Sequence, residues 1–270
     1  MSEKNIYKVD IIMGVYNCEK YIDDCIESII NQSFTNWRLI ICDDGSRDNT
    51  YNSVKKYTEK LEDKLLLLRN EKNMGLNYTL NKCISYSTAP FIARMDGDDI
   101  SAQDRLKKEV SFLESNSDYG FVSSNAIMFD ENGEWGSISF AEKPQKLDFL
   151  RISPFIHAAV LIKSEVLKSV NGYSVDERLL RVEDYHLWFK LYDKGVKGYN
   201  IQENLYYIRD DRDAANRRTW KNRKNEYYVR KIGYKMLNIP WYYRFYKYRP
   251  IILGLIPKRL YSFFHRKKLK

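Results

Sequence analysis

The chain has 270 residues, a formal net charge of +9 and a hydrophobic fraction of 44%. This composition is that of an ordinary globular chain and excludes a disordered or fibrous protein. The charge is divided unevenly. Residues 216–270 contain 17 Lys and Arg and one acidic residue, whereas residues 1–215 contain 28 Lys and Arg and 35 Asp and Glu. The sequence therefore combines an acidic body with a strongly basic C-terminal extension, defined here as residues 216–270.

Strands and helices alternate in the first part of the chain. Short apolar runs predict strands at 9–15, 39–42, 65–68 and 91–95. Helical periodicity between these runs predicts helices at 18–31, 48–61 and 76–84. Asn17 is placed to be the N-cap of the first helix. Such alternation with short links predicts a doubly wound, mainly parallel α/β sheet.

The pattern changes in the second part of the body. We expect a helix over 106–113 and then a hairpin, with strands at 120–129 and 135–140. A strand at 158–162, a helix at 183–193 and a strand at 198–208 complete the elements of the body. Together they predict one domain of residues 1–215, followed by the C-terminal extension.

Secretion and membrane-spanning signals are weak. The first seven residues are polar, and the best apolar run, at 251–256, is far shorter than the roughly 18 residues that span a bilayer. The cysteines form no CxxC pair and lie inside apolar patterns, so we expect buried, reduced thiols of a cytosolic protein rather than a zinc site. These cysteines are Cys18, Cys25, Cys42 and Cys83.

Polar residues follow three of the predicted strands. Tyr16 and Asn17 follow the first strand, Asp43 and Asp44 the second, and the segment 96–99 (DGDD) the fourth. Open parallel sheets bind ligands at the carboxyl ends of their strands, so these residues predict a ligand site. The sequence has neither GxGxxG after the first strand nor GxxxxGK[ST], which argues against dinucleotide and P-loop sites.

The DGDD segment places three carboxylates within four residues. Their mutual repulsion favours a divalent cation, and oxygen ligands suit Mg²⁺ or Mn²⁺ bound together with substrate phosphates. An ordinary turn is the alternative, because Asp and Gly are common turn residues. The position of the segment opposite a second acidic strand end favours the metal site.

Glu183 and Asp184 open the helix predicted at 183–193. The helix dipole alone favours acidic residues in a first turn. The functional alternative is a general base, a carboxylate that takes the proton of an attacking hydroxyl. His157, by itself, is more typical of a hydrogen-bonded structural residue than of a catalytic one.

Taken together, these motifs resemble a known family. The stretches IIMGVYNCEKYIDDCIESIINQSFTNWRLIICDDGSRDNT, FIARMDGDDISAQDRL and VEDYHLWFKL occur in this order. They resemble the family-two inverting glycosyltransferases of GT-A fold, especially bacterial enzymes that build capsule, exopolysaccharide or O-antigen repeat units. The resemblance covers roughly residues 7–210, and it implies a GT-A-like fold with a helical, aromatic and basic C-terminal extension.

The resemblance implies roles on the donor side. The loop after the first strand would flank the nucleotide base, through Val15, Tyr16 and Asn17. Asp44 would accept a hydrogen bond from the base, typically uracil, and Asp43 is the second candidate for this role. The DxD motif corresponds to Asp96 and Asp98, which would contact the ribose and the Mn²⁺ or Mg²⁺ that bridges the diphosphate, with Asp98 as the direct ligand.

The resemblance also implies the reaction. Asp184 would deprotonate the acceptor hydroxyl, with Glu183 beside it, in an inverting transfer from a nucleotide-sugar, preferably UDP-linked, to a glycan acceptor. His157 and Arg209 match family positions on the acceptor or phosphate side. Two departures from the family pattern, Ala158 after the histidine and the segment 210–220, both concern the acceptor pocket.

The C-terminal extension interleaves 13 aromatic residues with its 17 basic ones, most densely at 241–249. Basic residues with Trp, Tyr and Phe are typical of segments that lie on anionic membranes. Nucleic acid is a weaker alternative, and packing within the fold or an oligomer is another. The resemblance favours the membrane, since such enzymes often use polyprenyl-diphosphate-linked acceptors; it implies a cytoplasmic protein, peripheral on the inner face of the cell membrane.

Two other functions compete with sugar transfer. A nucleotidyltransferase would share the nucleotide-binding sheet and the metal, but such enzymes usually carry a glycine-rich loop after the first strand, which residues 14–17 (GVYN) do not form. A nucleic-acid-binding protein that uses the C-terminal extension would leave the acidic strand-end motifs unexplained.

Overall fold

The structure is a computed structural model that describes residues 7–210 and 219–255. Within these residues one sheet runs in the order β3-β2-β1-β4-β8-β6-β9-β5, with β7 paired to β6. The first four strands are mutually parallel: β1 (Val9–Val15), β2 (Trp37–Asp43), β3 (Leu65–Arg69) and β4 (Phe91–Arg94). The four strands predicted in the first part of the chain are therefore confirmed, with small changes at their ends.

The second half of the sheet is mixed. β8 (Leu161–Lys163) is antiparallel to both β4 and β6 (Tyr119–Asp130), and β9 (Lys197–Arg209) is parallel to β6. The edge strands β5 (Ile100–Ser101) and β7 (Gly133–Ile138) pair antiparallel with β9 and β6. The sheet is thus mainly parallel, as predicted. The strand predicted at 158–162 begins later, because residues 157–159 form a short 3₁₀ turn, η3.

Helices connect the strands and cover both faces of the sheet. Those of the body are α1 (Ile22–Ile30), α2 (Thr50–Lys55), α3 (Thr58–Leu61), α4 (Leu76–Ser85), α5 (Arg105–Ser115), α6 (Ser164–Ser169) and α7 (Glu183–Asp193). Short 3₁₀ turns are η1 (Glu62–Lys64), η2 (Asp148–Leu150) and η4 (Glu177–Leu179). The helix predicted at 48–61 is in fact divided into α2 and α3, whereas the helix predicted at 183–193 has the bounds of α7.

The predicted N-cap at Asn17 is wrong. Helix α1 begins at Ile22, with Tyr21 at its N-cap position. Asn17 lies in the left-handed region, with φ 53°, a conformation that Asn tolerates better than most residues. Its side chain accepts a hydrogen bond from the backbone of Arg47 instead of capping the helix.

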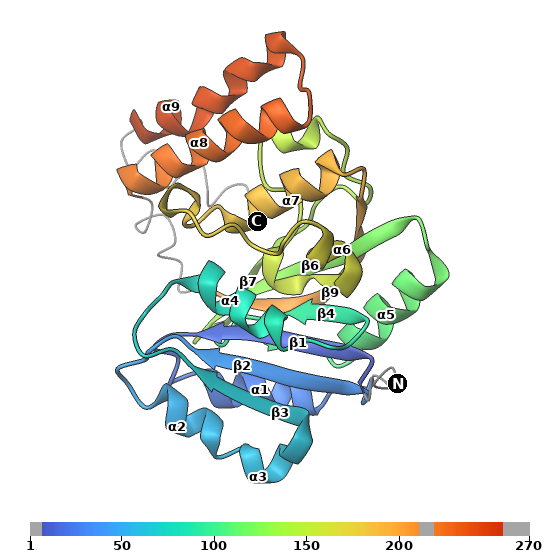
Figure 1. Cartoon of the computed structure of the whole chain (residues 1–270), viewed down its shortest axis with the longest axis vertical. Coiled ribbons are helices and arrows are strands. Elements are labelled where there is room, and N and C mark those ends of the chain that lie inside the picture. The colour runs from blue at the N-terminus through green and yellow to red at the C-terminus, as the bar shows by residue number, and fades with distance from the viewer. Residues whose placement is uncertain (1–6, 211–218, 256–270) are drawn as a thin grey trace.

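The core lies on the two faces of the sheet. Successive strand residues point to opposite faces, and in β1 both Ile11 and Ile12 are buried, in two different hydrophobic clusters. Helices therefore pack on both faces: α4 and α7 lie in front of the sheet in Figure 1 and α1 lies behind it. A sheet covered on both faces is typical of α/β folds. Within the described residues the four cysteines are free thiols, three of them buried and Cys18 partly exposed.

The C-terminal extension adds α8 (Trp220–Met236), the 3₁₀ segment η5 (Trp241–Tyr248) and α9 (Arg249–Leu255). Val229 and Tyr234 of α8 are buried in the same cluster as the residues of α7. Gly233 lies so close to Phe189 that a methyl group would overlap the ring. Residues 220–239 thus pack within the fold, above α7 in Figure 1. The remaining residues of the extension, 216–218 and 256–270, lie outside the described residues.

No helix in residues 7–210 or 219–255 combines the length and apolar character that crossing a bilayer requires.

Candidate active site

The loops after β1 and β2 are joined by hydrogen bonds. The backbone of Asp44 donates to the carbonyl of Val15 at 2.8 Å. The backbone of Asn17 donates to Ser46 Oγ at 3.0 Å. The two loops therefore form one rim at the carboxyl end of the sheet. Tyr16, which is 39% exposed, projects from this rim.

Asp43 and Asp44 are buried and hold neighbouring loops. Asp44 accepts hydrogen bonds from Asn70 Nδ2 at 2.8 Å and from the backbones of Met74 and Gly75 at 2.8 and 2.9 Å. Asp43 pairs with Arg69 Nε at 3.0 Å. Both carboxylates thus hold the chain at residues 69–75 against the end of β2. A contact of either carboxylate with a nucleotide base stays a prediction.

The DGDD segment turns tightly against the loop after β1. A Cβ on Gly97 would lie 2.7 Å from Val15 Cγ1, so the turn fits there only without a side chain. Both oxygens of Asp96 accept hydrogen bonds from the guanidinium of Arg94. Burial, and next the charge of Asp96, raises the pKa of Asp98. The segment therefore concentrates more negative charge than its protein partners neutralise.

Arg209 joins this acidic turn from the end of β9. Its backbone donates to Asp99 Oδ1 at 2.8 Å, and its Nε donates to the carbonyl of Asp98 at 3.0 Å. Its guanidinium lies 4.2 Å from the ring centroid of Tyr21 and 4.5 Å from that of Phe129. The structure thus brings together two predicted site elements that are about a hundred residues apart in sequence.

The predicted base lies in the first turn of α7. Ser153 Oγ donates to Asp184 Oδ2 at 2.9 Å. Burial raises the pKa of Asp184, while the hydrogen bond from Ser153 and the charge of Arg94 oppose that rise. Burial, and next the charge of Asp184, raises the pKa of Glu183 to about 7. A carboxylate with a raised pKa is a stronger proton acceptor when ionised, which suits a general base.

His157 is buried against aromatic residues. Its Nε2 lies 2.7 Å from Tyr173 Oη, and its ring packs edge-on against Trp188. Burial lowers the pKa of His157 well below its usual value, and the charge of Arg94 lowers it further. His157 is therefore neutral at pH 7 and holds Tyr173 in place.

Arg94 is the residue that sequence reasoning missed. It is 5% exposed, it ends β4, and it is ion-paired with Asp96. Its charge also acts on Asp98, Glu183 and Asp184. The available signal was a charged residue within the apolar run FIAR, directly before the DGDD segment. A buried cation at that position is costly unless acidic groups surround it.

A divalent cation fits the donor set of this turn. The described part of the chain has no group of three or more His, Cys, Asp or Glu side chains arranged as a complete metal site. Mg²⁺ and Mn²⁺, however, are commonly held by one or two carboxylates plus substrate phosphates. Since Asp96 is paired with Arg94, Asp98 is the carboxylate best placed to be the protein ligand.

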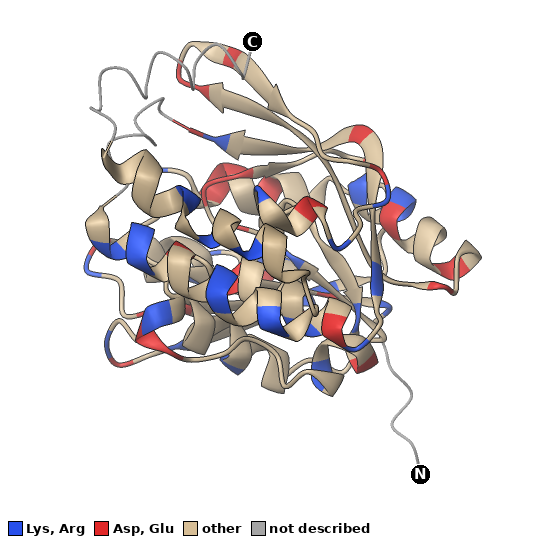
Figure 2. Ribbon diagram, turned by 90° about the horizontal axis from the view of Figure 1, so that it is seen from above, with Lys and Arg blue, Asp and Glu red and all other residues tan. Residues whose placement is uncertain are grey.

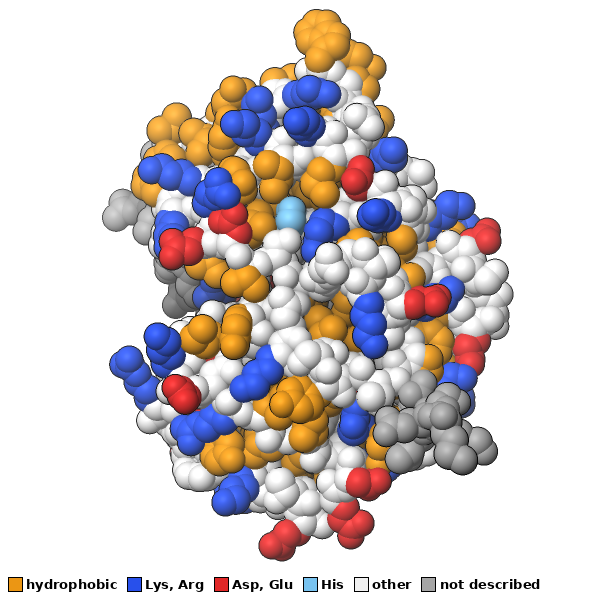
Figure 3. Space-filling view, in the orientation of Figure 1, with side chains coloured by type: hydrophobic (Ala, Val, Ile, Leu, Met, Phe, Trp, Pro, Cys, Tyr) orange, Lys and Arg blue, Asp and Glu red, His pale blue; other side chains and the backbone are white. Residues whose placement is uncertain are grey.

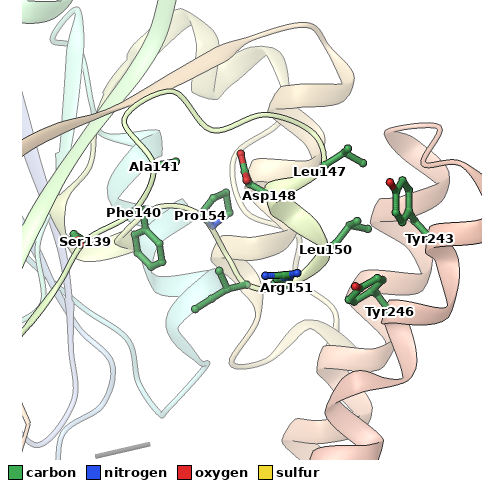
Figure 4. Close-up of a pocket in the computed structure, with 11 residues that line it drawn as sticks. Ser139, Phe140, Ala141, Leu147, Asp148, Leu150, Arg151, Pro154, Tyr243 and Tyr246 are labelled. Carbon is green, nitrogen blue, oxygen red and sulfur yellow. The ribbon is translucent and has the colours of Figure 1, made fainter. Parts of the chain in front are cut away.

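A cavity of about 630 Å³ is lined by Ile152 and Pro154, the two neighbours of Ser153. Leu150 also lines it, together with Tyr243 and Tyr246 of η5, whose rings stand at the right in Figure 4. Asp148 and Arg151 supply polar groups at its edge. Largely apolar walls with a few polar groups are typical of small-molecule sites.

The sequence matches the glycosyl transferase family 2 domain over residues 10–170. The chain belongs to this family. Among curated relatives it is 36% identical to the Bacillus subtilis glycosyltransferase EpsE, over 97% of this chain and 94% of EpsE. It is 30% identical to an Escherichia coli enzyme, UDP-Glc:alpha-D-GlcNAc-diphosphoundecaprenol beta-1,3-glucosyltransferase WfgD, over 72% of this chain and 74% of that protein.

Solved structures show the same fold. Residues 1–349 of Staphylococcus aureus TarS match with a TM-score of 0.67 and 20% identity, over 90% of this chain and 69% of that one. The mannosyltransferase PcManGT of Pyrobaculum calidifontis matches with a TM-score of 0.62 and 17% identity, over 94% of this chain and 83% of that one. The predicted GT-A-like fold and the predicted family are thus confirmed, and the chain is a glycosyltransferase.

Replacing Arg94 with Met should destabilise the protein, because it leaves buried carboxylates without their cation. We expect a loss of about 3–5 kcal/mol in the free energy of unfolding, measured with denaturant at neutral pH. The loss should be smaller at mildly acidic pH, since removing the charge raises the pKa of Asp184 and lets it become neutral. Lys60→Met, which breaks the exposed pair with Glu27, is the control and should cost at most about 1 kcal/mol. Equal losses in the two variants would contradict the role of Arg94.

Proposed function

We propose that this glycosyltransferase moves a sugar from a UDP-sugar to a hydroxyl of a lipid-linked glycan, with inversion, in bacterial surface polysaccharide synthesis. The observation that carries the proposal is the acidic DGDD turn at the carboxyl end of β4, to which Arg94 and Arg209 donate hydrogen bonds, in a chain of glycosyl transferase family 2. The DGDD turn after β4 and Asp184 of α7 both interact with the charge of Arg94. One site suits a nucleotide diphosphate and the other suits proton removal.

The proposed donor-binding part of the site lies at the carboxyl end of the sheet. Tyr16 would stack on the nucleotide base, with Val15 and Asn17 beside it and Asp43 and Asp44 below. Arg209, whose Nε donates to the carbonyl of Asp98, would contact a phosphate of the donor. Negative charge grows on the diphosphate as it leaves, and fixed positive groups stabilise that charge. Mn²⁺ or Mg²⁺ held by Asp98 and Asp96 would add Lewis-acid stabilisation of the leaving diphosphate.

The acceptor half supplies the base. A sugar hydroxyl is too weakly acidic to ionise at neutral pH, so Asp184 takes its proton as the oxygen attacks the anomeric carbon. The bond to the diphosphate breaks as the new glycosidic bond forms, and a single displacement inverts the anomeric centre. Glu183, whose pKa is raised to about 7, lies beside Asp184 and would help to hold the base or the acceptor in position.

Named relatives support UDP as the donor nucleotide. WfgD carries UDP-Glc in its name, and TarS has been solved with UDP and with UDP-GlcNAc. PcManGT was solved with GDP-Man and Mn²⁺. A panel of UDP-Glc, UDP-GlcNAc and GDP-Man, with and without Mn²⁺, therefore separates the nucleotides. The bound donor should raise the unfolding temperature.

Asp184→Asn should keep the fold and donor binding but lower turnover about 10²–10⁴-fold, because it removes the base. Turnover is measured as UDP release and product formation with a GlcNAc-diphosphate-undecaprenol acceptor. Asp193→Asn, at the exposed C-terminal end of α7, is the matched control and should behave as wild type. Near-normal turnover of Asp184→Asn would overturn the assignment of the base, and a panel without any stabilising nucleotide would overturn the donor site.

The cavity lined by Ile152 and Pro154, which flank Ser153, is the proposed acceptor pocket. Tyr243 and Tyr246 offer aromatic faces on which a sugar ring can stack, while Asp148 and Arg151 can hydrogen bond its hydroxyls or a phosphate. The name of WfgD includes a diphosphoundecaprenol-linked GlcNAc, an acceptor of this chemistry. The pocket therefore fits the sugar and phosphate part of a lipid-linked acceptor better than the lipid chain.

Tyr246→Ala should raise the KM for the acceptor about tenfold, the effect of losing about 1.4 kcal/mol of binding, and leave the KM for the donor unchanged. An acceptor with a short prenyl chain keeps the membrane out of this measurement. Tyr242→Ala, the exposed neighbour of Tyr243 on η5, is the control. An unchanged acceptor KM in Tyr246→Ala would exclude this pocket.

The end of the C-terminal extension is the proposed membrane contact. Trp241 and Phe245 of η5 are 80% and 62% exposed, and Ile252 and Leu255 of α9 are 59% and 71% exposed. Figure 3 shows hydrophobic side chains gathered at the end of the molecule formed by η5 and α9, with Lys and Arg close by. In Figure 2 basic positions recur along the helices nearest the viewer. Each Lys or Arg near an anionic surface contributes about 1 kcal/mol.

The double variant Trp241→Ser/Phe245→Ser should lose binding to phosphatidylglycerol vesicles in a flotation assay, because it removes the two large exposed rings of η5. Wild-type binding should weaken but persist at high salt, since both charge and apolar contact contribute. Tyr86→Ser, which removes an exposed ring at the end of α4, is the control and should float as wild type. A double variant that floats equally well would overturn the membrane contact.

A further inference from the structure

The C-terminal extension is hydrogen bonded to a short turn that precedes the base. The turn is η2, whose last carbonyls have no partners within so short a helix. Arg230 of α8, which is 1% exposed, donates to the carbonyl of Leu150 and, at 2.9 Å, to that of Arg151. One buried guanidinium therefore holds two successive carbonyls of the turn.

Further donors converge on the same turn. Tyr234 Oη donates to the carbonyl of Leu150 at 2.9 Å, and Arg249 Nη1 donates to that of Arg151 at 3.1 Å. Tyr185 Oη donates to the carbonyl of Phe149. Three of these four donors, Arg230, Tyr234 and Arg249, belong to the extension. The end of η2 is therefore fixed mainly by residues of the C-terminal extension.

The turn leads directly to the base. Ser153, two residues after Arg151, donates to Asp184 Oδ2 at 2.9 Å. Arg230 also lies 5.4 Å from the ring centroid of Tyr185, the residue that follows Asp184. Arg230 is therefore connected to Asp184 by two routes. One runs through the segment 149–153 and the other through Tyr185 in the first turn of α7. Glu226 Oε1, 2.8 Å from Arg230 Nη2, balances its charge.

We propose that Arg230 is a positioning residue of the sugar transfer: it fixes the segment 149–153 so that Ser153 holds the Asp184 carboxylate toward the acceptor hydroxyl. This inference rests on the proposed role of Asp184 as the base. Burying a guanidinium is costly, and the Nε of Arg230 has no hydrogen-bond partner among the described residues, so an apolar side chain would serve packing alone at lower cost. The contacts of Arg230 therefore indicate that it fixes the position of the segment 149–153 and does not serve packing alone.

The test uses the full-length enzyme with UDP-Glc, UDP-GlcNAc or GDP-Man and a GlcNAc-diphosphate-undecaprenol acceptor. Arg230→Met should lower kcat about 10- to 100-fold with an unchanged donor KM, since a displaced base costs up to about 10²-fold. Lys231→Met, the same change at the adjacent exposed position, is the control and should behave as wild type. Arg230→Lys, which keeps the charge, should recover part of the loss.

The pH dependence of kcat separates positioning from loss of stability. A hydrogen bond to an ionised carboxylate lowers its pKa, so Ser153→Ala should move the acidic limb of kcat to higher pH. Arg230→Met should move it in the same direction, and the double variant should move it no further than Ser153→Ala. Arg94, Glu183 and Tyr173, which also face Asp184, are unchanged in each variant.

Each result has a distinct meaning. A folded Arg230→Met enzyme with wild-type kcat and acidic limb would overturn the inference, as would additive shifts in the double variant. If Arg230→Met fails to fold, Arg230→Lys and Ser153→Ala decide in its place, and wild-type pH profiles in both would overturn it. If the wild-type enzyme transfers no sugar while binding no nucleotide, the proposed function fails instead, independently of Arg230.

Discussion

The ion pair between Arg94 and Asp96 is the interaction on which the site depends. A guanidinium at the end of a buried strand is tolerated because a carboxylate of the DGDD turn, Asp96, is ion-paired with it. Its charge also opposes the rise that burial causes in the pKa of Asp184 at the start of α7, about 90 residues later in the chain. The charge of Arg94 therefore favours the ionised form both of the DGDD turn and of Asp184, the two places proposed for the donor and the base. In an inverting transfer the leaving group and the base must lie on opposite sides of one carbon, which requires both to be held in place.

The parallel strands supply the frame around this pair. Because β1, β2 and β4 run in one direction, their carboxyl ends meet at one edge, and the loops that follow them bind to one another. Asp43 and Asp44 illustrate how the frame is built. Their position at a strand end is that of ligand-binding residues, yet their carboxylates are largely engaged in holding the loops at 45–47 and 70–75. Rigid loops around Tyr16 favour binding, since little conformational entropy is then lost when the donor binds.

The C-terminal extension divides into two parts with different physical roles. Residues 220–239 carry buried apolar side chains and the buried Arg230, and they complete the core above α7. Residues 241–255 present aromatic and aliphatic side chains to solvent, with basic residues between them. The basic residues of the extension thus have two roles. Arg230 donates hydrogen bonds inside the fold, and the basic residues of 241–255 contribute positive charge to the surface. A membrane contact at η5 would lie next to the cavity that Tyr243 and Tyr246 line, which would bring a lipid-linked acceptor to the base.

The sequence alone determined the strands of the first half and their mainly parallel sheet, the family and the candidate site residues. The spacing of apolar residues along strands and helices indicates which residues are buried. Motifs at strand ends such as DGDD indicate a chemical function because that function needs specific residue types. It could not show that Asn17 lies outside α1, since that depends on the hydrogen bond with Arg47 across two loops. Nor could it show that residues 220–239 of the basic extension pack inside the fold, because charge composition does not reveal which face of a helix meets the core. Arg94 and Arg230 were decided by tertiary structure alone: a charged side chain is stable in a protein interior only where distant segments bring carboxylates or free carbonyls to it, and only the folded chain does so.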